Sequence, residues 1–204
     1  MYSTDVSTDG IFLRRLYERS ISTVTGIWRE ILFYDGHEEC IALLHGELKE
    51  GPTLCRIHSD CLSSHLALSI ECDCRDQMQL AQELVVKNGS GLILILPQDG
   101  RGFGHYALMA ATELARKRQT TQTEAYRALM GRPDGRDYGC AAAVLRAMGV
   151  RDVDLLTNNP DKVRALADLG VNVASTVPVV VDDLYTRPEL QDSYQDKVYQ
   201  GHKL

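Results

Sequence analysis

The chain is organised around one stretch, Arg56-Ile-His-Ser-Asp-Cys61-Leu-Ser-Ser-His-Leu-Ala-Leu-Ser-Ile-Glu-Cys72-Asp-Cys74. An expected strand at residues 53–57 leads into it, so a sheet and a candidate site meet here. Three of the six cysteines lie in it, in the spacing C-x10-C-x-C. Thiolates this close together favour zinc, and in a strand residues 72 and 74 would point to the same face. Three thiolates would leave a fourth position for water, as a catalytic zinc site requires.

Two other interpretations of these cysteines stay open. The first is a group of buried free thiols, because free cysteine is often a core residue. The polar Asp73 between two cysteines argues against it. The second is zinc with a purely structural role, which would need a fourth protein ligand such as His65.

Outward from this stretch, apolar runs and turn residues predict strands first and then alternating strands and helices. Asp35-Gly36 between two apolar runs is typical of a hairpin. Strands are expected at 31–34, 40–46, 91–96, 153–156 and 171–181, and helices at 76–87, 104–118, 122–130, 138–148 and from 160 onward. The order predicts an α/β (or α+β) fold, a mixed sheet with flanking helices in a single domain at residues 25–204.

The two ends of the chain carry weaker patterns. Residues 1–24 are expected to be an N-terminal leader, with a helical turn where Phe12, Leu13, Leu16 and Tyr17 form a short amphipathic pattern. The polar residues after position 181 are expected to be a tail.

Composition excludes several classes of function. A net charge of −6 gives no general attraction to nucleic acid or to an anionic membrane. No apolar run is long enough to cross a bilayer, and the first twenty residues lack the apolar segment of a secretory signal. Six unevenly spaced cysteines are typical of a reduced, cytoplasmic metalloprotein.

Three further motifs offer polar groups, each with a plain structural alternative. Gly100-x-Gly102-x-Gly104 with Arg101 follows a strand and suits an anion, although an ordinary strand-to-helix turn explains it equally well. Asp134 and Arg136 offer a base and a phosphate ligand, or else form an exposed turn. Thr157 and Lys162 flank a helix start that Asn159 and Pro160 would cap in any case.

Together these motifs resemble the GTP cyclohydrolase II family from about Ile27 to the C-terminus. The resemblance rests on Arg56-Ile-His-Ser-Asp-Cys61, Cys72-Asp-Cys74, Gln98-Asp-Gly-Arg101, Asp134-Gly-Arg-Asp137 and Leu155-Leu-Thr-Asn-Asn-Pro160, which keep the order of the family. It implies zinc-dependent hydrolysis of the guanine ring of GTP at C8, with release of formate and pyrophosphate. It also implies a role in riboflavin biosynthesis, a pyrimidine ribosyl phosphate as product, and a homodimer.

The resemblance also assigns roles to single residues. Zinc would be held by Cys61, Cys72 and Cys74, and magnesium would bridge the triphosphate. Asp134 would be the general base. Arg136 fills the position assigned as nucleophile, although a guanidinium that stays protonated suits electrostatic stabilisation of the phosphate at least as well. The GTP site would be lined by Arg56, Ile57, His58, Ser59, Asp60, Gln77, Asp99, Gly100, Arg101, Thr157 and Lys162.

One departure from the family concerns a tyrosine that assists the ring chemistry. Thr112 occupies its position, Tyr106 lies about 120° away around the expected helix, and His105 lies on nearly the same face. A residue is added further on, so that Thr121 and Gln122 compete for a threonine contact of the family. Two alternatives follow: a truncated reaction that retains the formyl group for another pathway, or a non-catalytic GTP-binding module.

Overall fold

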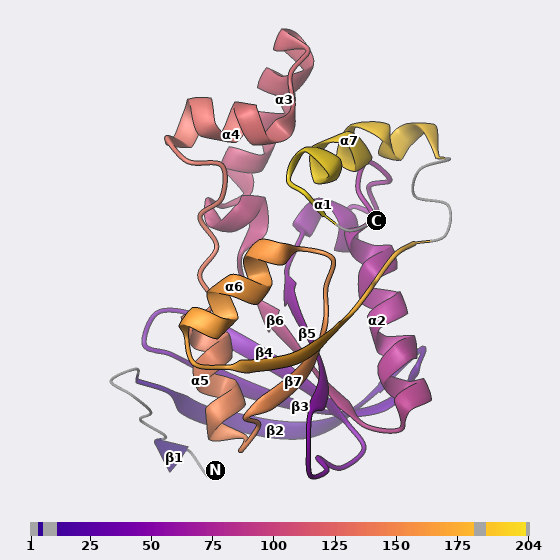
Figure 1. Ribbon diagram of the computed structural model, residues 1–204, viewed down its shortest axis with the longest axis vertical. Coiled ribbons are helices and arrows are strands. Elements are labelled where there is room, and N and C mark those ends of the chain that lie inside the picture. Colours follow the sequence, from indigo (N-terminus) through magenta and orange to yellow (C-terminus); the bar gives the residue numbers. More distant parts are fainter. Residues whose placement is uncertain (1–3, 6–11, 182–186, 203–204) are drawn as a thin grey trace.

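The computed structural model describes residues 4–5, 12–181 and 187–202. Within these residues the chain forms one mixed sheet of eight strands in the order β1-β2-β3-β4-β6-β5-β7-β8 (Figure 1). The strands are β1 (Thr4–Asp5), β2 (Arg14–Thr23), β3 (Gly26–Tyr34), β4 (Glu39–His45), β5 (Thr53–Ser59), β6 (Gly91–Leu96), β7 (Asp152–Leu156) and β8 (Asn172–Val177). This architecture confirms the predicted α/β fold with a mixed sheet.

The sheet has an antiparallel half and a parallel half. Strands β1 to β4 and the β4–β6 pair are antiparallel, whereas β6-β5-β7-β8 are parallel. The predicted hairpin joins β3 to β4: the Asp35 carboxylate accepts hydrogen bonds from the backbone N–H groups of His37 and Glu38, each at 2.8 Å. In the parallel half, the carboxyl ends of β5, β6 and β7 lie along the same edge of the sheet. Ligands of open α/β sheets bind outside the carboxyl ends of the strands.

Helices cover both faces of the sheet and extend beyond that edge (Figure 1). They are α1 (Leu62–His65), α2 (Cys74–Asn88), α3 (His105–Arg118), α4 (Gln122–Met130), α5 (Gly139–Ala147), α6 (Pro160–Asp168) and α7 (Gln191–Tyr199), with 3-10 turns η1 (Asp99–Gly102) and η2 (Pro188–Leu190). Helices α5 and α6 pack one core cluster against the sheet, and α2 packs another. Helices α3 and α4 pack on each other in a third, smaller cluster. None of the described helices is long and apolar enough to cross a membrane.

The helical turn expected near the N-terminus is wrong, whereas most of residues 1–11 lie outside the described residues. No helical turn forms at residues 12–17; β2 runs from Arg14 to Thr23, inside the segment 1–24 that was expected to be a leader, and pairs with β3 along its length. Pairing across the sheet outweighs the weak local helical pattern. The polar tail after 181 contains η2 and α7, which pack on the rest of the molecule and bury Leu190 and Asp196. The last strand also ends earlier than expected, at Val177.

Candidate functional site

Three thiols converge beyond the carboxyl end of β5. Cys61 precedes α1, Cys72 lies in a bend, and Cys74 is the first residue of α2. Their Sγ atoms all lie within 4.8 Å of one another, and those of Cys61 and Cys72 are 3.8 Å apart. Tetrahedral zinc with Zn–S bonds of about 2.3 Å needs sulfur atoms about 3.8 Å apart, so the group fits this metal. Residues 72–74 do not form a strand; the start of α2 brings the thiols together instead.

The thiols also influence one another's protonation. Hydrogen bonds from Cys61 and Cys74 lower the pKa of the Cys72 thiol, whereas the hydrogen bonds among the three groups raise the pKa of Cys61 and Cys74. Without a metal, the group therefore favours one thiolate beside two thiols. His65 does not join the group: its Nδ1 lies 2.9 Å from the carbonyl oxygen of Cys61. Among the described residues, the group that could hold a metal contains the three cysteines alone. A purely structural site with His65 as fourth ligand therefore has no support from this geometry.

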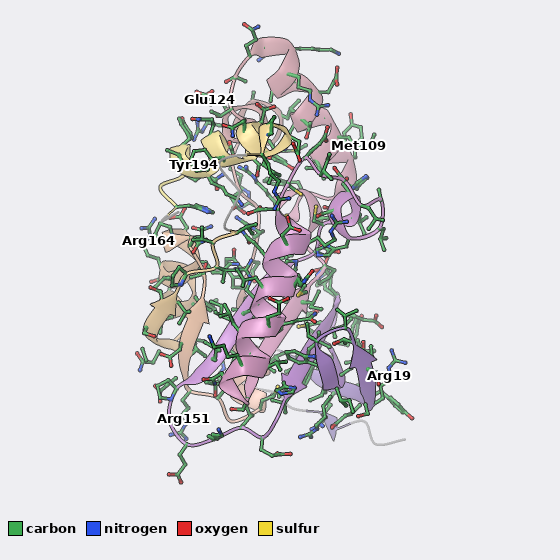
Figure 2. The ribbon with its side chains drawn as sticks, turned by 90° about the vertical axis from the view of Figure 1, so that its right-hand side faces the viewer. Arg19, Met109, Glu124, Arg151, Arg164 and Tyr194 are labelled. Atoms are coloured by element: carbon green, nitrogen blue, oxygen red, sulfur yellow. The ribbon has the colours of Figure 1, made fainter. Side chains whose placement is uncertain are left out.

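A cavity of about 1140 Å³ opens beside the cysteines. Its walls come from the end of β5, the η1 turn, α3, α4 and α7; Figure 2 shows Met109 of α3 and Tyr194 of α7 at the same end of the molecule. The predicted site residues that line it are Ser59, Asp60, Cys61, Cys72, Cys74, Asp99, Gly100, Arg101 and Arg136. The structure thus brings four separate motifs of the sequence to one cavity.

A second set of predicted residues does not line the cavity: Arg56, Ile57, His58, Gln77, Asp134, Thr157 and Lys162. All of them except Gln77 and Asp134 are buried. Arg56 is 7% exposed and donates hydrogen bonds to the carbonyl of Leu156 at 2.9 Å and to Oε1 of Gln77 at 2.7 Å. Lys162 is 5% exposed and donates to the carbonyl of Ile57 at 2.8 Å. Thr157 serves a local turn, because its hydroxyl accepts from the N–H of Asn159 at 3.1 Å.

These buried cations lie close enough to repel one another. Burial and then the charge of Arg56 lower the pKa of Lys162 well below its usual range, and Arg136 acts in the same direction. Burial also lowers the pKa of Arg56. A cluster of Arg56, Arg136 and Lys162 would be stabilised by a polyanion, because an anion would offset the repulsion.

Asp134 and Arg136 form a tight ion pair in the loop before α5. The guanidinium Nε lies 3.0 and 3.1 Å from the two carboxylate oxygens, and the backbone N–H of Arg136 donates to the same carboxylate at 2.9 Å. Burial alone would raise the pKa of Asp134, but hydrogen bonds from Arg136 lower it. Burial alone would lower the pKa of Arg136, but the Tyr138 phenol and Asp134 raise it. Both groups therefore stay charged near neutral pH.

Arg101 is held by protein groups on several sides. Its Nη1 donates to the hydroxyl of Thr123 at 2.9 Å and to the carbonyl of Pro133 at 3.3 Å, and its Nη2 forms an ion pair with Asp196. The prediction of Arg101 as a simple anion ligand did not include these contacts. Nearby, Asp99 lies 2.6 Å from Nδ1 of His105, so His105 has a partner of its own.

Thr112 is the residue expected at the position of the family's tyrosine. Thr112 lines the cavity, and its hydroxyl accepts from Nε2 of Gln122 at 3.0 Å. Tyr106 is 81% exposed and does not line the cavity, as its position around the helix predicted. Thr121 is the N-cap of α4, with a capping box to Glu124.

Sequence reasoning missed Tyr126 and the residues of α7. Tyr126 lies on α4, lines the cavity and is fully buried, and its hydroxyl has no hydrogen-bond partner among the described residues. Asp196, Lys197 and His202 reach the cavity from the C-terminal segment. No motif marks any of these residues, so a single sequence offered no signal for them.

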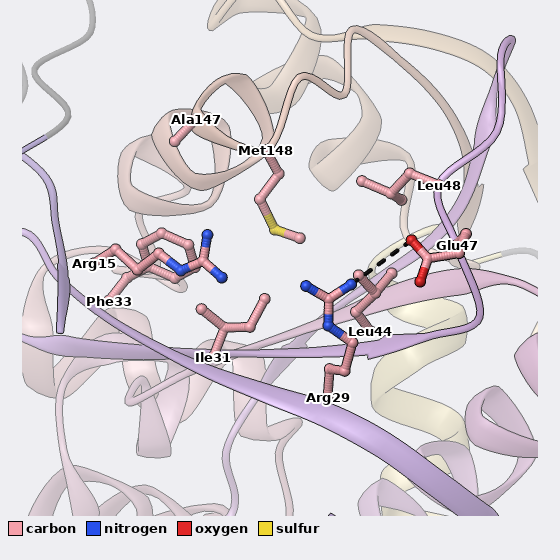
Figure 3. Close-up of a pocket in the computed structure, with 9 residues that line it drawn as sticks. All are labelled: Arg15, Arg29, Ile31, Phe33, Leu44, Glu47, Leu48, Ala147 and Met148. Atoms are coloured by element: carbon pink, nitrogen blue, oxygen red, sulfur yellow. Dashed lines mark ion pairs between the residues drawn. The ribbon is translucent and has the colours of Figure 1, made fainter. Parts of the chain in front are cut away.

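A second, smaller cavity of about 440 Å³ lies between the antiparallel strands and the end of α5 (Figure 3). Figure 3 shows Met148 reaching between Arg15 and Arg29, and Arg29 is 3.8 Å from Glu47. This smaller cavity is lined by Arg15, Arg29, Ile31, Phe33, Leu44, Glu47, Leu48, Ala147 and Met148. None of these was a predicted site residue.

Fold and site together define an α/β protein with a three-cysteine group at the carboxyl ends of parallel strands, next to buried cations. The family model described as GTP cyclohydrolase II matches residues 14–178. The chain belongs to the GTP cyclohydrolase II family, a family of hydrolases.

Two relatives illustrate this similarity. The chain is 37% identical over 171 residues to a GTP cyclohydrolase-2 of Neisseria meningitidis, covering 83% of this chain and 85% of that protein. It is 44% identical over 147 residues to the riboflavin biosynthesis protein RibBA of Aquifex aeolicus, covering 71% of this chain but only 36% of that longer protein. Among solved structures, a two-domain 3,4-dihydroxy-2-butanone 4-phosphate synthase from A. baumannii matches with a TM-score of 0.47 and 22% identity, over 83% of this chain and 40% of that one.

Proposed function

We propose that this chain is a zinc-dependent hydrolase that opens the guanine ring of GTP at C8 and releases pyrophosphate. The products would be formate and a pyrimidine ribosyl phosphate. The observation that carries the proposal is the group of three thiols, with Sγ atoms within 4.8 Å of one another, at the wall of a cavity that also contains Arg101 and Arg136. Zinc held by Cys61, Cys72 and Cys74 would supply Lewis-acid activation of water.

Arg136 supplies fixed positive charge in this proposal. A guanidinium with a raised pKa keeps its proton, so it has no lone pair for attack on phosphorus. It is suited to stabilising negative charge that develops on a phosphate. Asp134 holds Arg136 in place through its carboxylate. The same contact makes Asp134 a weaker proton acceptor, so its larger contribution in this proposal is to orient Arg136 rather than to act as the base.

The buried cations Arg56 and Lys162 lie behind the cavity wall and would attract the triphosphate through their positive charge, with magnesium bridging its oxygens. Their mutual repulsion in the protein favours a polyanionic ligand over a neutral one. The guanine base of GTP would be bound by polar groups at the ends of β5 and β6, namely Asp60 and Asp99. Each has one buried oxygen, Oδ1, without a hydrogen-bond partner among the described residues.

The test is mass spectrometry of the product formed from GTP with zinc and magnesium. A pyrimidine product that has lost both C8 and pyrophosphate supports the proposal. Recovery of unchanged GTP after prolonged incubation with zinc-loaded protein contradicts it.

A second candidate is a truncated reaction in which the formyl group stays on the product, for a pathway other than riboflavin biosynthesis. The observation that favours it is Thr112, which places a short hydroxyl already bonded to Gln122 where the family has a phenol. The same mass spectrum separates the two reactions, because the truncated product keeps the mass of the formyl group.

A GTP-binding module without turnover is the remaining alternative, and binding of GTP without product would support it. Three further parts of the proposal are a homodimer, a role in riboflavin biosynthesis and a cytoplasmic location. The first two come from the family resemblance and the name of the Aquifex relative, and the third from the six unevenly spaced cysteines. Light scattering of the purified protein tests the first of these.

A further inference from the structure

Helix α7 lies next to the cavity that holds the candidate site. In Figure 1 it is the yellow helix above α1, close to α4. Residues of α7 and the segment after it contribute to the cavity wall, among them Asp196, Lys197 and His202. The match to the family model ends at residue 178, so it assigns no role to this helix.

Asp196 joins α7 to two elements of the site. It is 4% exposed and forms an ion pair with Arg101 of the η1 turn. Its Oδ1 accepts from the backbone N–H of Thr123, in the first turn of α4, at 2.7 Å. Its Oδ2 also accepts from Nε2 of Gln200 at 2.6 Å. A buried carboxylate with this many donors is firmly held, because separating a buried ion pair leaves a charge uncompensated.

Lys197 makes a second connection, to the cysteine group. Its ammonium forms an ion pair with Asp73, the residue between Cys72 and Cys74. The other carboxylate oxygen of Asp73 accepts from Nε2 of Gln77 at 2.9 Å, and Oε1 of Gln77 accepts from Arg56 at 2.7 Å. The helix is therefore linked through side chains to both the metal group and the buried cations.

His202 follows α7 and enters the cavity. Its backbone N–H donates to the carbonyl of Lys197 at 3.0 Å, which joins the backbone of His202 to the last turn of α7. The buried Nε2 has no hydrogen-bond partner among the described residues. Burial and then the charges of Lys197, Arg136, Lys162 and Arg101 lower its pKa to about 4. A neutral imidazole among four cations lies where an anionic group would be attracted.

We propose that α7 completes the nucleotide site. Asp196 is a positioning residue that orients Arg101, and His202 is a ligand for the phosphate end of the nucleotide. This inference rests on the proposed function. The alternative, in which Asp196 competes with the nucleotide for Arg101, predicts the opposite change in KM.

Asp196→Asn tests the positioning role. We expect KM for GTP to rise about 10-fold with a smaller change in kcat, since a charge-assisted contact that orients Arg101 is weakened. Glu189→Gln is the matched control: it removes the same charge from an exposed residue in the turn before α7 and should keep the wild-type KM. An unchanged or lower KM in Asp196→Asn overturns the proposal, and a lower one supports competition.

His202→Ala tests the role of His202 as a phosphate ligand. It also keeps the proposal testable if Asp196→Asn does not fold. Calorimetry should show about 10-fold weaker binding of GTP and a smaller loss for GMP, because GMP has fewer phosphate oxygens. His37→Ala, on the exposed hairpin, is the control. Equal losses for both nucleotides, or none, overturn this role.

Hydrogen exchange in the wild-type protein gives an independent measurement. Binding of GTP should slow exchange of the α7 amides, and faster exchange would overturn the proposal. If the wild type neither binds nor converts GTP, the proposed function fails; if it turns over GTP while both variants behave like wild type, only this inference fails.

Discussion

Tyr126 carries a hydroxyl that folding removes from water without giving it a hydrogen-bond partner among the described residues. Such a group costs free energy, so removing it should not destabilise the protein. We predict that Tyr126→Phe leaves the free energy of unfolding unchanged or raises it by about 1 kcal/mol, measured by urea denaturation. Tyr106→Phe, on the exposed side of α3, is the control. A loss of stability well above that of the control would show that the hydroxyl has a partner in solution.

Cys72 is the ligand whose loss tests the metal group most simply. Because the three sulfur atoms lie within 4.8 Å of one another, replacing one leaves two thiols and an alcohol, a much weaker set for zinc. We predict that Cys72→Ser purifies with little or no zinc by elemental analysis. Cys140→Ser, outside the group, should keep the wild-type content; full zinc in Cys72→Ser would refute the assignment.

His58 makes stability depend on pH. Burial and then the charge of Arg56 hold its pKa well below its usual range, so the folded protein keeps the ring neutral. Below about pH 6.5 the unfolded chain binds a proton on this histidine that the folded protein does not bind. The free energy of unfolding therefore decreases as the pH is lowered, by up to about 1.4 kcal/mol per pH unit. We predict a shallower fall between pH 7 and 5 in His58→Leu, measured by denaturant unfolding with chelator present. Equal slopes in the two proteins would contradict this account.

The loop between β6 and α3 depends on glycine at one position more than at another. Gly102 and Gly104 both have positive φ, +80° and +87°. A Cβ on Gly102 would lie 2.9 Å from backbone atoms of Gly135 and Arg136, whereas a Cβ on Gly104 would meet nothing within 4 Å. A side chain at position 102 would therefore displace the backbone segment that carries Arg136.

We predict that Gly104→Ala costs about 1–3 kcal/mol of stability from backbone strain alone, because Gly104 combines φ +87° with an extended ψ, and that it leaves kcat/KM for GTP near that of the wild type. Gly102→Ala should cost more stability and also lower kcat/KM, because Arg136 must move. Both variants are compared by denaturation and by steady-state rates. Equal effects would show that the contact with Gly135 is easily relieved.

Several elements were predictable from the sequence because local signals agreed with the fold. The Asp35-Gly36 turn, the Asn159-Pro160 helix start and the apolar run of β6 all formed as expected. Strand β2 and helix α7 were not predictable. The position of β2 is fixed by pairing with β3, and that of α7 by ion pairs with Arg101 and Asp73, which are distant in the sequence.

The whole molecule explains why scattered motifs form one site. The parallel strands β5, β6 and β7 end at the same edge, so the residues that follow them meet there. The resemblance to the family implied that the five motifs form one site; residues of four of them line the cavity, whereas Thr157 of the fifth and the nearby Lys162 do not. The sequence did not show which predicted residues line the cavity and which are buried behind it. Arg56 and Lys162 are buried through contacts that only the packed structure reveals.

The most direct test of the account follows the C8 carbon itself. GTP labelled with 13C at C8 is incubated with zinc-loaded protein and magnesium, and the label is observed by NMR. We predict that the signal of the intact guanine ring disappears and that of formate grows, with no such change for zinc-free Cys72→Ser. Label that stays in the intact guanine ring throughout would contradict the central claim that this site hydrolyses GTP at C8.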